Sequence, residues 1–224
     1  MPEFELHTYY RSSCSGRLRI ALNLKNLHTD YVYVHLFKGE QRSEKHMQLN
    51  PSGTVPVLLH QREDEGGSFS ITQSIAALEY LEEIYPDQVP LLPPLSQPPD
   101  RAKVRTLVNI VAIDIQPFSN RSVVKRVTDL GGNAEEWNSG FMTKGLQAYE
   151  AVAAKTAGRY SVGDRITLAD VCLVPAIWAA EKHDVELQKF PTVMRIYKAM
   201  SELEAVQKAH WSSQEDTPAD MAWL

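Results

Sequence analysis

The stretch from residue 12 to 25 constrains this chain most, because a cluster of small polar residues there joins a strand to a helix. Residues 4–9 alternate apolar and polar side chains, which is the period of a β-strand. From residue 18 onward apolar side chains return at helical spacing. The polar residues at the junction are Ser12, Ser13, Cys14 and Ser15. Free N–H groups and the dipole at a helix start favour an anion. This corner therefore predicts an anion site, and a thiolate is the most useful anion to hold there.

Charge and cysteine content exclude several classes of protein. The net charge of −5, without a long basic run, argues against nucleic acid or an acidic membrane as the main partner. The apolar run 171–180 is too short to span a bilayer, and residues 1–5 carry acids where a targeting peptide carries Lys or Arg. The two cysteines, Cys14 and Cys172, form neither a disulfide framework nor a metal motif. We expect a cytoplasmic protein without a metal site or a membrane span.

The first part of the chain predicts a small α/β domain over residues 1–86. Two helical patterns alternate with four strand patterns in the order βαβ followed by ββα. Besides residues 4–9, the strands are expected at 31–36, 57–60 and 69–71, with a hairpin turn at 63–67 and a helix opened by residues 72–74. Residues 38–47 are expected to be irregular or a short helix. Pro56 lies at a strand start, where proline is tolerated, and its isomer is left open.

The second part predicts an all-helical domain over residues 100–224. Six of the thirteen prolines fall between residues 86 and 99, so residues 87–99 are expected to be a linker. No strand pattern follows. Helices are expected at 101–127 with a break at Gln116-Pro117, at 135–157, at 167–178 and at 190–206. Thr167 and Asp170 have capping-box spacing, which assigns them to folding.

Several motifs together resemble the glutathione transferases. These are Ser-Ser-Cys-Ser-x-Arg-x-Arg-Ile-Ala-Leu from residue 12, the Asn-Pro…Val-Pro turn, the Gln-Ser helix start and the Val-Gly-Asp…Ala-Asp capping box. The first resembles the zeta class in particular, the maleylacetoacetate isomerases. Gln116-Pro117, Asn120, Ser122 and Asp216-Thr217-Pro218 also match that class. The resemblance implies a thioredoxin-like first domain, a helical second domain, a homodimer and glutathione as co-substrate.

The resemblance also implies a reaction, the cis–trans isomerisation of maleylacetoacetate in tyrosine and phenylalanine catabolism. Glutathione thiolate adds to the alkene, the bond rotates, and the thiolate leaves. A free thiol has a pKa of about 8.5, and lowering this pKa by two units needs about 2.7 kcal/mol. A helix start supplies about 0.3–1 kcal/mol and a donated hydroxyl about 1.5–3 kcal/mol. The dipole and one serine are therefore sufficient together.

Ser12 is the first choice for that hydroxyl, and Ser13 is the second. At least one serine of the cluster is expected only to cap the helix, since a helix has one N-cap. Cys14 is a third candidate, because Cys14 to Arg17 resembles a thioredoxin motif that has lost its second cysteine; otherwise Cys14 lines the substrate pocket. Other glutathione transferases use a tyrosine near the first strand, but burial in the strand explains Tyr9 and Tyr10 more simply.

Further residues are candidates for binding glutathione. The Val55 backbone pairs with its cysteinyl amide, Gln73 and Ser74 hold its γ-glutamyl carboxylate, and Gln41 reaches its glycyl end. Ser15, Gly16 and Arg17 complete the glutathione contacts at the first helix start. On the second domain the candidates are Gln116, Asn120, Arg121 and Ser122. The alternative for these last residues is that they satisfy backbone groups freed by Pro117.

Two arginines follow in the first helix. A cation early in a helix opposes the dipole, so Arg17 requires an anionic neighbour. Either a substrate dicarboxylate or a structural Asp or Glu is the candidate. Arg19 is expected at the surface or at an interface.

Two positions depart from the zeta pattern and leave the substrate open. Gly16 stands where the class has an aromatic residue, and Lys182 where it has an arginine. A second hypothesis is therefore a general glutathione transferase that conjugates or dehalogenates small electrophiles such as α-haloacids. A third is a non-catalytic scaffold of the same fold, which the intact serine cluster argues against.

Overall fold

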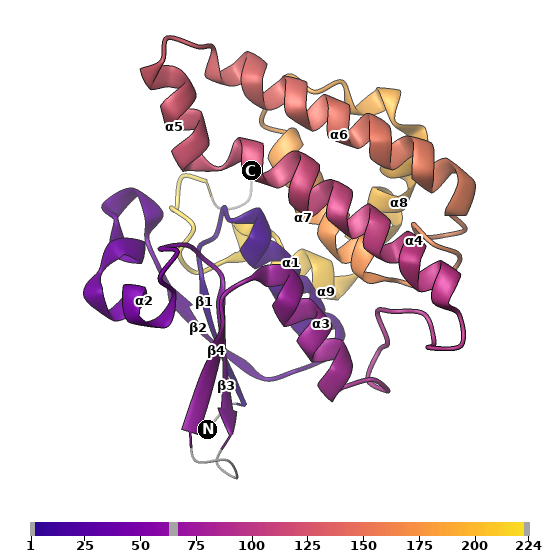
Figure 1. Cartoon of the computed structure of the whole chain (residues 1–224), viewed down its shortest axis with the longest axis horizontal. Helices are drawn as coiled ribbons and strands as arrows, with labels where there is room; N and C mark the ends of the chain where they lie inside the picture. Colours follow the sequence, from indigo (N-terminus) through magenta and orange to yellow (C-terminus); the bar gives the residue numbers. More distant parts are fainter. Residues whose placement is uncertain (1–2, 63–66, 222–224) are drawn as a thin grey trace. The chain divides into compact units, whose positions relative to one another are not determined.

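The computed structural model describes residues 3–62 and 67–221, which form two compact units (Figure 1). The first unit extends to Val89 and also contains the segment from Leu203 onward, while the second spans Pro90–Glu202. The first boundary thus lies three residues after the predicted one. The end of the chain differs more from the prediction, because the sequence assigned it to the helical domain. Residues 63–66 of the predicted hairpin turn lie outside the described residues.

The first unit is built on a four-stranded sheet in the order β2-β1-β3-β4. β1 (Phe4–Thr8) runs parallel to β2 (Thr29–Tyr33) and antiparallel to β3 (Val57–Arg62), and β3 pairs antiparallel with β4 (Gly67–Ile71). In Figure 1, α1 (Ser13–Leu24) and α3 (Ser74–Ile84) lie on one side of this sheet. This arrangement confirms the predicted thioredoxin-like domain. β2 begins and ends earlier than the predicted strand 31–36.

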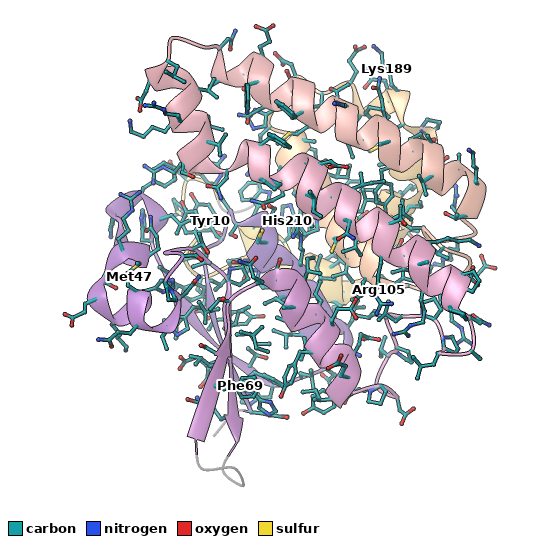
Figure 2. The ribbon with its side chains drawn as sticks, in the orientation of Figure 1. Tyr10, Met47, Phe69, Arg105, Lys189 and His210 are labelled. Atoms are coloured by element: carbon teal, nitrogen blue, oxygen red, sulfur yellow. The ribbon has the colours of Figure 1, made fainter. Side chains whose placement is uncertain are left out.

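Three connections meet at one end of the sheet, where β1 and β4 finish and β3 begins. His7, near the carboxyl end of β1, pairs with Val57 at the start of β3. Leu58 next to it pairs with Ile71, the last residue of β4. The start of α1, the loop before β3 and the start of α3 therefore all lie at this end. In Figure 2, Tyr10 marks this end of the sheet and Phe69 lies toward the opposite end.

Short helices connect β2 to β3. Two 3-10 turns, η1 (Leu36–Lys38) and η2 (Glu40–Arg42), precede α2 (Glu44–Leu49). α2 lies across the sheet from α1 and α3 (Figure 1). The sequence left this region open between irregular structure and a short helix. The Val55–Pro56 bond that follows is cis.

The second unit contains only helices among its described elements, as predicted. α4 (Pro98–Asn109) begins with two prolines, which suits the first positions of a helix, so it starts within the predicted linker. The expected break at Pro117 begins earlier. The chain turns π-helical in η4 (Ile110–Ile115), continues as the 3-10 turn η5 (Gln116–Ser119) and resumes as α5 (Arg121–Asp129).

Four further helices follow η4 and α5 in sequence. They are α6 (Ala134–Thr156), α7 (Leu168–Ala180), α8 (Pro191–Ser201) and, in the first unit, α9 (Glu204–Ala209). Short 3-10 turns precede α8, at Leu187–Lys189, and follow α9, at Trp211–Ser213. A Cβ atom at Gly145 would lie 2.2 Å from Ile115 Cγ1, so α6 passes η4 closely enough to require glycine. Within 3–62 and 67–221, no helix has both the length and the apolar character needed to cross a membrane.

The capping box at the start of α7 forms as predicted. The fully buried Asp170 carboxylate accepts hydrogen bonds from Ser161 N at 2.8 Å, Thr167 N at 2.8 Å and Thr167 Oγ1 at 2.9 Å. Burial raises the pKa of Asp170, and these hydrogen bonds oppose that shift. Asp170 thus ties the loop before α7 to the helix start.

We predict that Asp170→Ala lowers the free energy of unfolding by about 3 kcal/mol, because three buried donors lose a charged acceptor. Urea denaturation followed by circular dichroism measures the loss. Asp164→Ala is the matched control, since Asp164 accepts the Arg159 N–H in the exposed part of the same loop. Equal losses in the two variants would contradict a specific role for the capping box.

Candidate active site

Ser12 is the N-cap of α1. Its Oγ accepts the Ser15 N–H at 3.1 Å, and its own N–H donates to the Tyr9 carbonyl at 3.0 Å. A hydroxyl has one donor hydrogen besides its acceptor lone pairs, so capping leaves the hydrogen available. No hydrogen bond within the described part of the chain uses the Ser12 O–H as donor. The sequence treated capping and thiolate activation as competing roles, but one serine can perform both.

The residues after Ser12 form the first turn of α1. Ser13 and Cys14 are partly exposed, whereas Ser15 and Gly16 are buried. Cys14 carries a free thiol. The Ser15 Oγ is buried, and no described residue forms a hydrogen bond with it. The polar cluster thus presents two accessible side chains, a serine and a cysteine, beside the cap.

Tyr9 and Tyr10 belong to the core, as the simpler prediction has it. They form a buried cluster with Val34 and Val55, and their own rings meet edge to face with centroids 4.6 Å apart. Burial is the main cause that raises the pKa of Tyr9 far above its ordinary value, and a hydrogen bond with Tyr10 adds to the shift. Packing therefore accounts for both tyrosines.

Arg17 is buried, and no carboxylate among the described residues pairs with it. Its Nη1 donates to Ser74 Oγ at 3.1 Å, while Nε and Nη2 have no hydrogen-bond partner among residues 3–62 and 67–221. A buried charge without a partner is costly, and the binding of an anionic ligand beside it removes that cost. The sequence left two partners open for Arg17, a ligand carboxylate or a structural Asp or Glu. No described Asp or Glu pairs with it, so a ligand carboxylate is the alternative that the structure favours.

The start of α3 lies beside this guanidinium. Ser74 is the first residue of α3, and Gln73 is its exposed N-cap, without a capping hydrogen bond from its side chain. The free N–H groups of the first turn favour an anion, as they do at α1. The Arg17–Ser74 hydrogen bond therefore joins two helix starts and a buried cation in one place.

The loop before β3 offers a free stretch of backbone. Neither the N–H nor the carbonyl of Val55 forms a hydrogen bond within the described structure. The neighbouring Thr54 carbonyl is held by Asn50 Nδ2 at 2.8 Å and by His46 Nε2 at 2.9 Å. The sequence missed these two supporting residues, although the Asn-Pro pair marked the turn. A fixed loop with unpaired backbone groups suits an extended peptide ligand.

Gln41 lies next to the same loop. A Cβ atom at Gly53 would lie 3.4 Å from the Gln41 carbonyl oxygen, so the two segments are in close approach. The Gln41 Oε1 is buried, and no described residue donates to it. The role of Gln41 in binding the glycyl end of glutathione stays a prediction.

The candidates on the second unit have local partners. Asn120 is the N-cap of α5, and its Oδ1 accepts both the Ser122 N–H at 3.2 Å and the Ser122 hydroxyl at 3.1 Å. Gln116 opens η5, and Arg121 is exposed in the first turn of α5. Capping accounts for Asn120 and Ser122, as in the alternative that the sequence left open. A role of these four residues in glutathione binding stays a prediction.

The prediction for Arg19 is wrong. This side chain is 1% exposed, and its guanidinium donates to the side chain or carbonyls of three residues around the end of β1 and to the Ala209 carbonyl. Backbone carbonyls from two segments distant in sequence accept hydrogen bonds from its guanidinium, in place of water. Elsewhere, Lys182 lies just beyond α7 in the second unit. No group of three metal-ligating side chains occurs in the described ranges.

Comparison with known proteins gives the same assignment as the motifs. The N-terminal domain model of glutathione S-transferase matches residues 11–84, and the C-terminal domain model matches residues 127–212. The maleylacetoacetate isomerase of Aspergillus fumigatus is 52% identical over 220 residues, which cover 98% of this chain and 95% of that protein.

Two solved structures are similar over nearly the whole chain. One is a maleylpyruvate isomerase described as a bacterial zeta-class glutathione S-transferase, with 36% identity, a TM-score of 0.85, and coverage of 96% of this chain and 100% of that one. The other is the maleylacetoacetate isomerase of Anaeromyxobacter dehalogenans with bound dicarboxyethyl glutathione and citrate. It has 37% identity, a TM-score of 0.85, and coverage of 96% and 94%. The chain therefore belongs to the zeta class of the glutathione transferases, the family of the maleylacetoacetate isomerases.

Proposed function

We propose that this protein is a glutathione-dependent isomerase that converts maleylacetoacetate to fumarylacetoacetate in tyrosine and phenylalanine catabolism. The observation that carries the proposal is the capped start of α1, where the Ser12 hydroxyl keeps its hydrogen free to donate. The 52% identity to a maleylacetoacetate isomerase supports the substrate. The dicarboxyethyl glutathione adduct bound in the Anaeromyxobacter dehalogenans enzyme supports a site for a thiol and a dicarboxylate.

The proposed chemistry begins with the glutathione thiolate, which accepts a hydrogen bond from the Ser12 hydroxyl at the positive end of α1. The sulfur adds to the alkene carbon that is conjugated to the substrate carbonyls, and the π electrons move to a carbonyl oxygen. The former double bond is then single and rotates. Collapse of the enolate re-forms the double bond in the trans geometry and expels the thiolate. No electron or atom is gained overall, so no further co-reactant is needed.

Glutathione is proposed to bind at the end of the sheet described above. Arg17 and Ser74, with Gln73 beside them, hold the γ-glutamyl carboxylate, because the Arg17 guanidinium already contacts that helix start. Val55 pairs with the cysteinyl amide through its free backbone groups, and Gln41 holds the glycyl end. Arg17 is thereby assigned to the cofactor rather than to the substrate.

Two further features are proposed, the first from the family resemblance and the second from a sequence with no disulfide framework. We expect a homodimer, which light scattering coupled to size-exclusion chromatography tests, and a cytoplasmic location. A second candidate function, conjugation or dehalogenation of small electrophiles such as α-haloacids, uses the same thiolate. Gly16 and Lys182 favour it, because both depart from the class at positions that bear on the substrate.

We predict that Ser12→Ala lowers kcat for glutathione-dependent isomerisation of maleylacetone about 10- to 100-fold, because the thiolate loses a charge-assisted hydrogen bond. Ser12→Gly gives the same loss of activity while costing only a few tenths of a kcal/mol in helix capping, which separates activation from stability. Ser13→Ala and Cys14→Ala are the matched controls.

The outcomes of this experiment are distinct. Full activity in the Ser12 variants, with a loss in Ser13→Ala or Cys14→Ala, would transfer the role of donor to that residue. An inactive wild type that still binds glutathione would refute the isomerase and leave the general transferase or the scaffold.

We predict that Arg17→Met raises the Kd of glutathione about 10- to 100-fold, because the γ-glutamyl carboxylate loses its charged partner. Calorimetric titration measures this Kd beside that of cysteinylglycine, which lacks the γ-glutamyl group. The wild type prefers glutathione, and the variant loses that preference. Lys208→Met controls for the loss of one exposed charge. A raised KM for maleylacetone with an unchanged Kd for glutathione would instead assign Arg17 to the substrate.

A further inference from the structure

The C-terminal segment is bonded to the region that joins β1 to α1. Asn23 of α1 donates from Nδ2 to the Ala205 carbonyl at 2.9 Å, and Arg19 donates from Nε to the Ala209 carbonyl at 3.0 Å. Farther along the segment, the Asp216 carboxylate accepts the Tyr10 N–H through Oδ2 at 2.9 Å. Trp211 packs against the buried cluster that contains Tyr9 and Tyr10. All of these residues lie within the first unit.

The backbone just before Ser12 is fixed on both sides by these contacts. The Tyr10 N–H goes to Asp216, and the Tyr10 carbonyl accepts from Arg19 Nη2 at 3.1 Å. The Tyr9 carbonyl accepts from Arg19 Nη1 at 3.2 Å and from the Ser12 N–H at 3.0 Å. Arg19 and Asp216 thus hold the peptide groups from which the Ser12 side chain is positioned.

Asp216 is not placed as an ordinary surface aspartate or as a structural ion-pair member. It is half-buried, and its Oδ1 is buried without a hydrogen-bond partner among the described residues. Burial raises the pKa of Asp216, and the hydrogen bond from Tyr10 and then the charge of Arg19 oppose that shift. No ion pair joins the Asp216 and Arg19 side chains. The one side-chain hydrogen bond of Asp216 in the described structure is the bond to the Tyr10 amide. The position of Asp216 is therefore explained by its hydrogen bond with the Tyr10 amide.

We propose that Asp216 is a positioning residue for the reaction: by holding the Tyr10 amide, the C-terminal segment orients the Ser12 hydroxyl toward the glutathione sulfur. This inference rests on the proposed role of Ser12. Small displacements of a donor are costly, since errors of about 1 Å reduce rates by up to about 100-fold. The contact spans 206 positions of sequence, so it also makes the far end of the chain part of the active-site domain.

The test compares three variants of Asp216 in the full chain. Asp216→Ala removes the acceptor, Asp216→Glu keeps the charge but displaces the carboxylate by one methylene, and Asp216→Asn keeps an acceptor oxygen in place without the charge. Glu215→Ala is the matched control, because Glu215 is exposed in the same segment. The first readout is the pKa of bound glutathione thiol, from the ultraviolet absorbance of its thiolate. The second is kcat and KM for maleylacetone.

We expect the Ala and Glu variants to raise the pKa of the bound thiol by about one unit and to lower kcat about tenfold near neutral pH. The Kd of glutathione stays within about threefold of the wild type, because the other ligand contacts are intact. Asn restores the wild-type pKa and kcat, and Glu215→Ala changes neither. If the Ala variant does not fold, the Glu variant carries the same test.

An unchanged thiol pKa in the folded Ala or Glu variant would overturn the proposal. So would failure of Asn to restore it, because the charge and not the hydrogen bond would then be responsible. The thiol titration needs only glutathione. A wild type that binds glutathione as thiolate but does not isomerise maleylacetone would therefore refute the isomerase while leaving the positioning role to be decided by the same titration.

Discussion

The structure of the first unit depends on how the junction between β1 and α1 satisfies its polar groups. A helix start exposes N–H groups that need acceptors, and the Ser12 hydroxyl supplies one of them to Ser15. The end of β1 has carbonyls that need donors, and the buried Arg19 supplies these. Hydrogen bonds from within the junction and from the C-terminal segment therefore hold it in place, while the Ser12 O–H remains unused in the described structure. In the proposed function, this unused donor activates the thiol.

Electrostatic imbalance is the second theme of this unit. Two helix starts and the buried Arg17 lie at one end of the sheet, and no described carboxylate neutralises them. A protein that leaves a buried cation unpaired gives up stability in the free state. A ligand with a carboxylate and a thiolate restores the balance, which agrees with the proposal of glutathione. The free backbone at Val55 adds the peptide-like recognition that a small anion alone would not use.

Features encoded by neighbouring residues could be predicted from the sequence. Periodicity gave the strands and α1, and the spacing of Thr167 and Asp170 gave the capping box. Features decided by distant contacts could not. The sequence around Arg19 predicts a surface residue, but contacts with the end of β1 and with the C-terminal segment bury it. The end of α8 at Ser201 lacks a Pro or Gly signal, so the separate α9 and its place beside α1 were missed.

The candidate site divides along the same line. Ser12, Gln73 and Ser74 lie at helix starts, which local sequence identifies. The pairing of Arg17 with Ser74 spans 57 positions, and the support of Thr54 by His46 depends on the fold of the loop. The π-helical turn at Ile110–Ile115 was hidden because apolar residues continue through it.

The central claim is that the Ser12 hydroxyl donates to the sulfur of bound glutathione. A crystal structure of the protein with glutathione tests it most directly. The account predicts the sulfur within hydrogen-bond reach of Ser12 Oγ, with the γ-glutamyl carboxylate at Arg17 and Ser74. A sulfur bonded instead to Ser13 or Cys14, with Ser12 only capping α1, would contradict it.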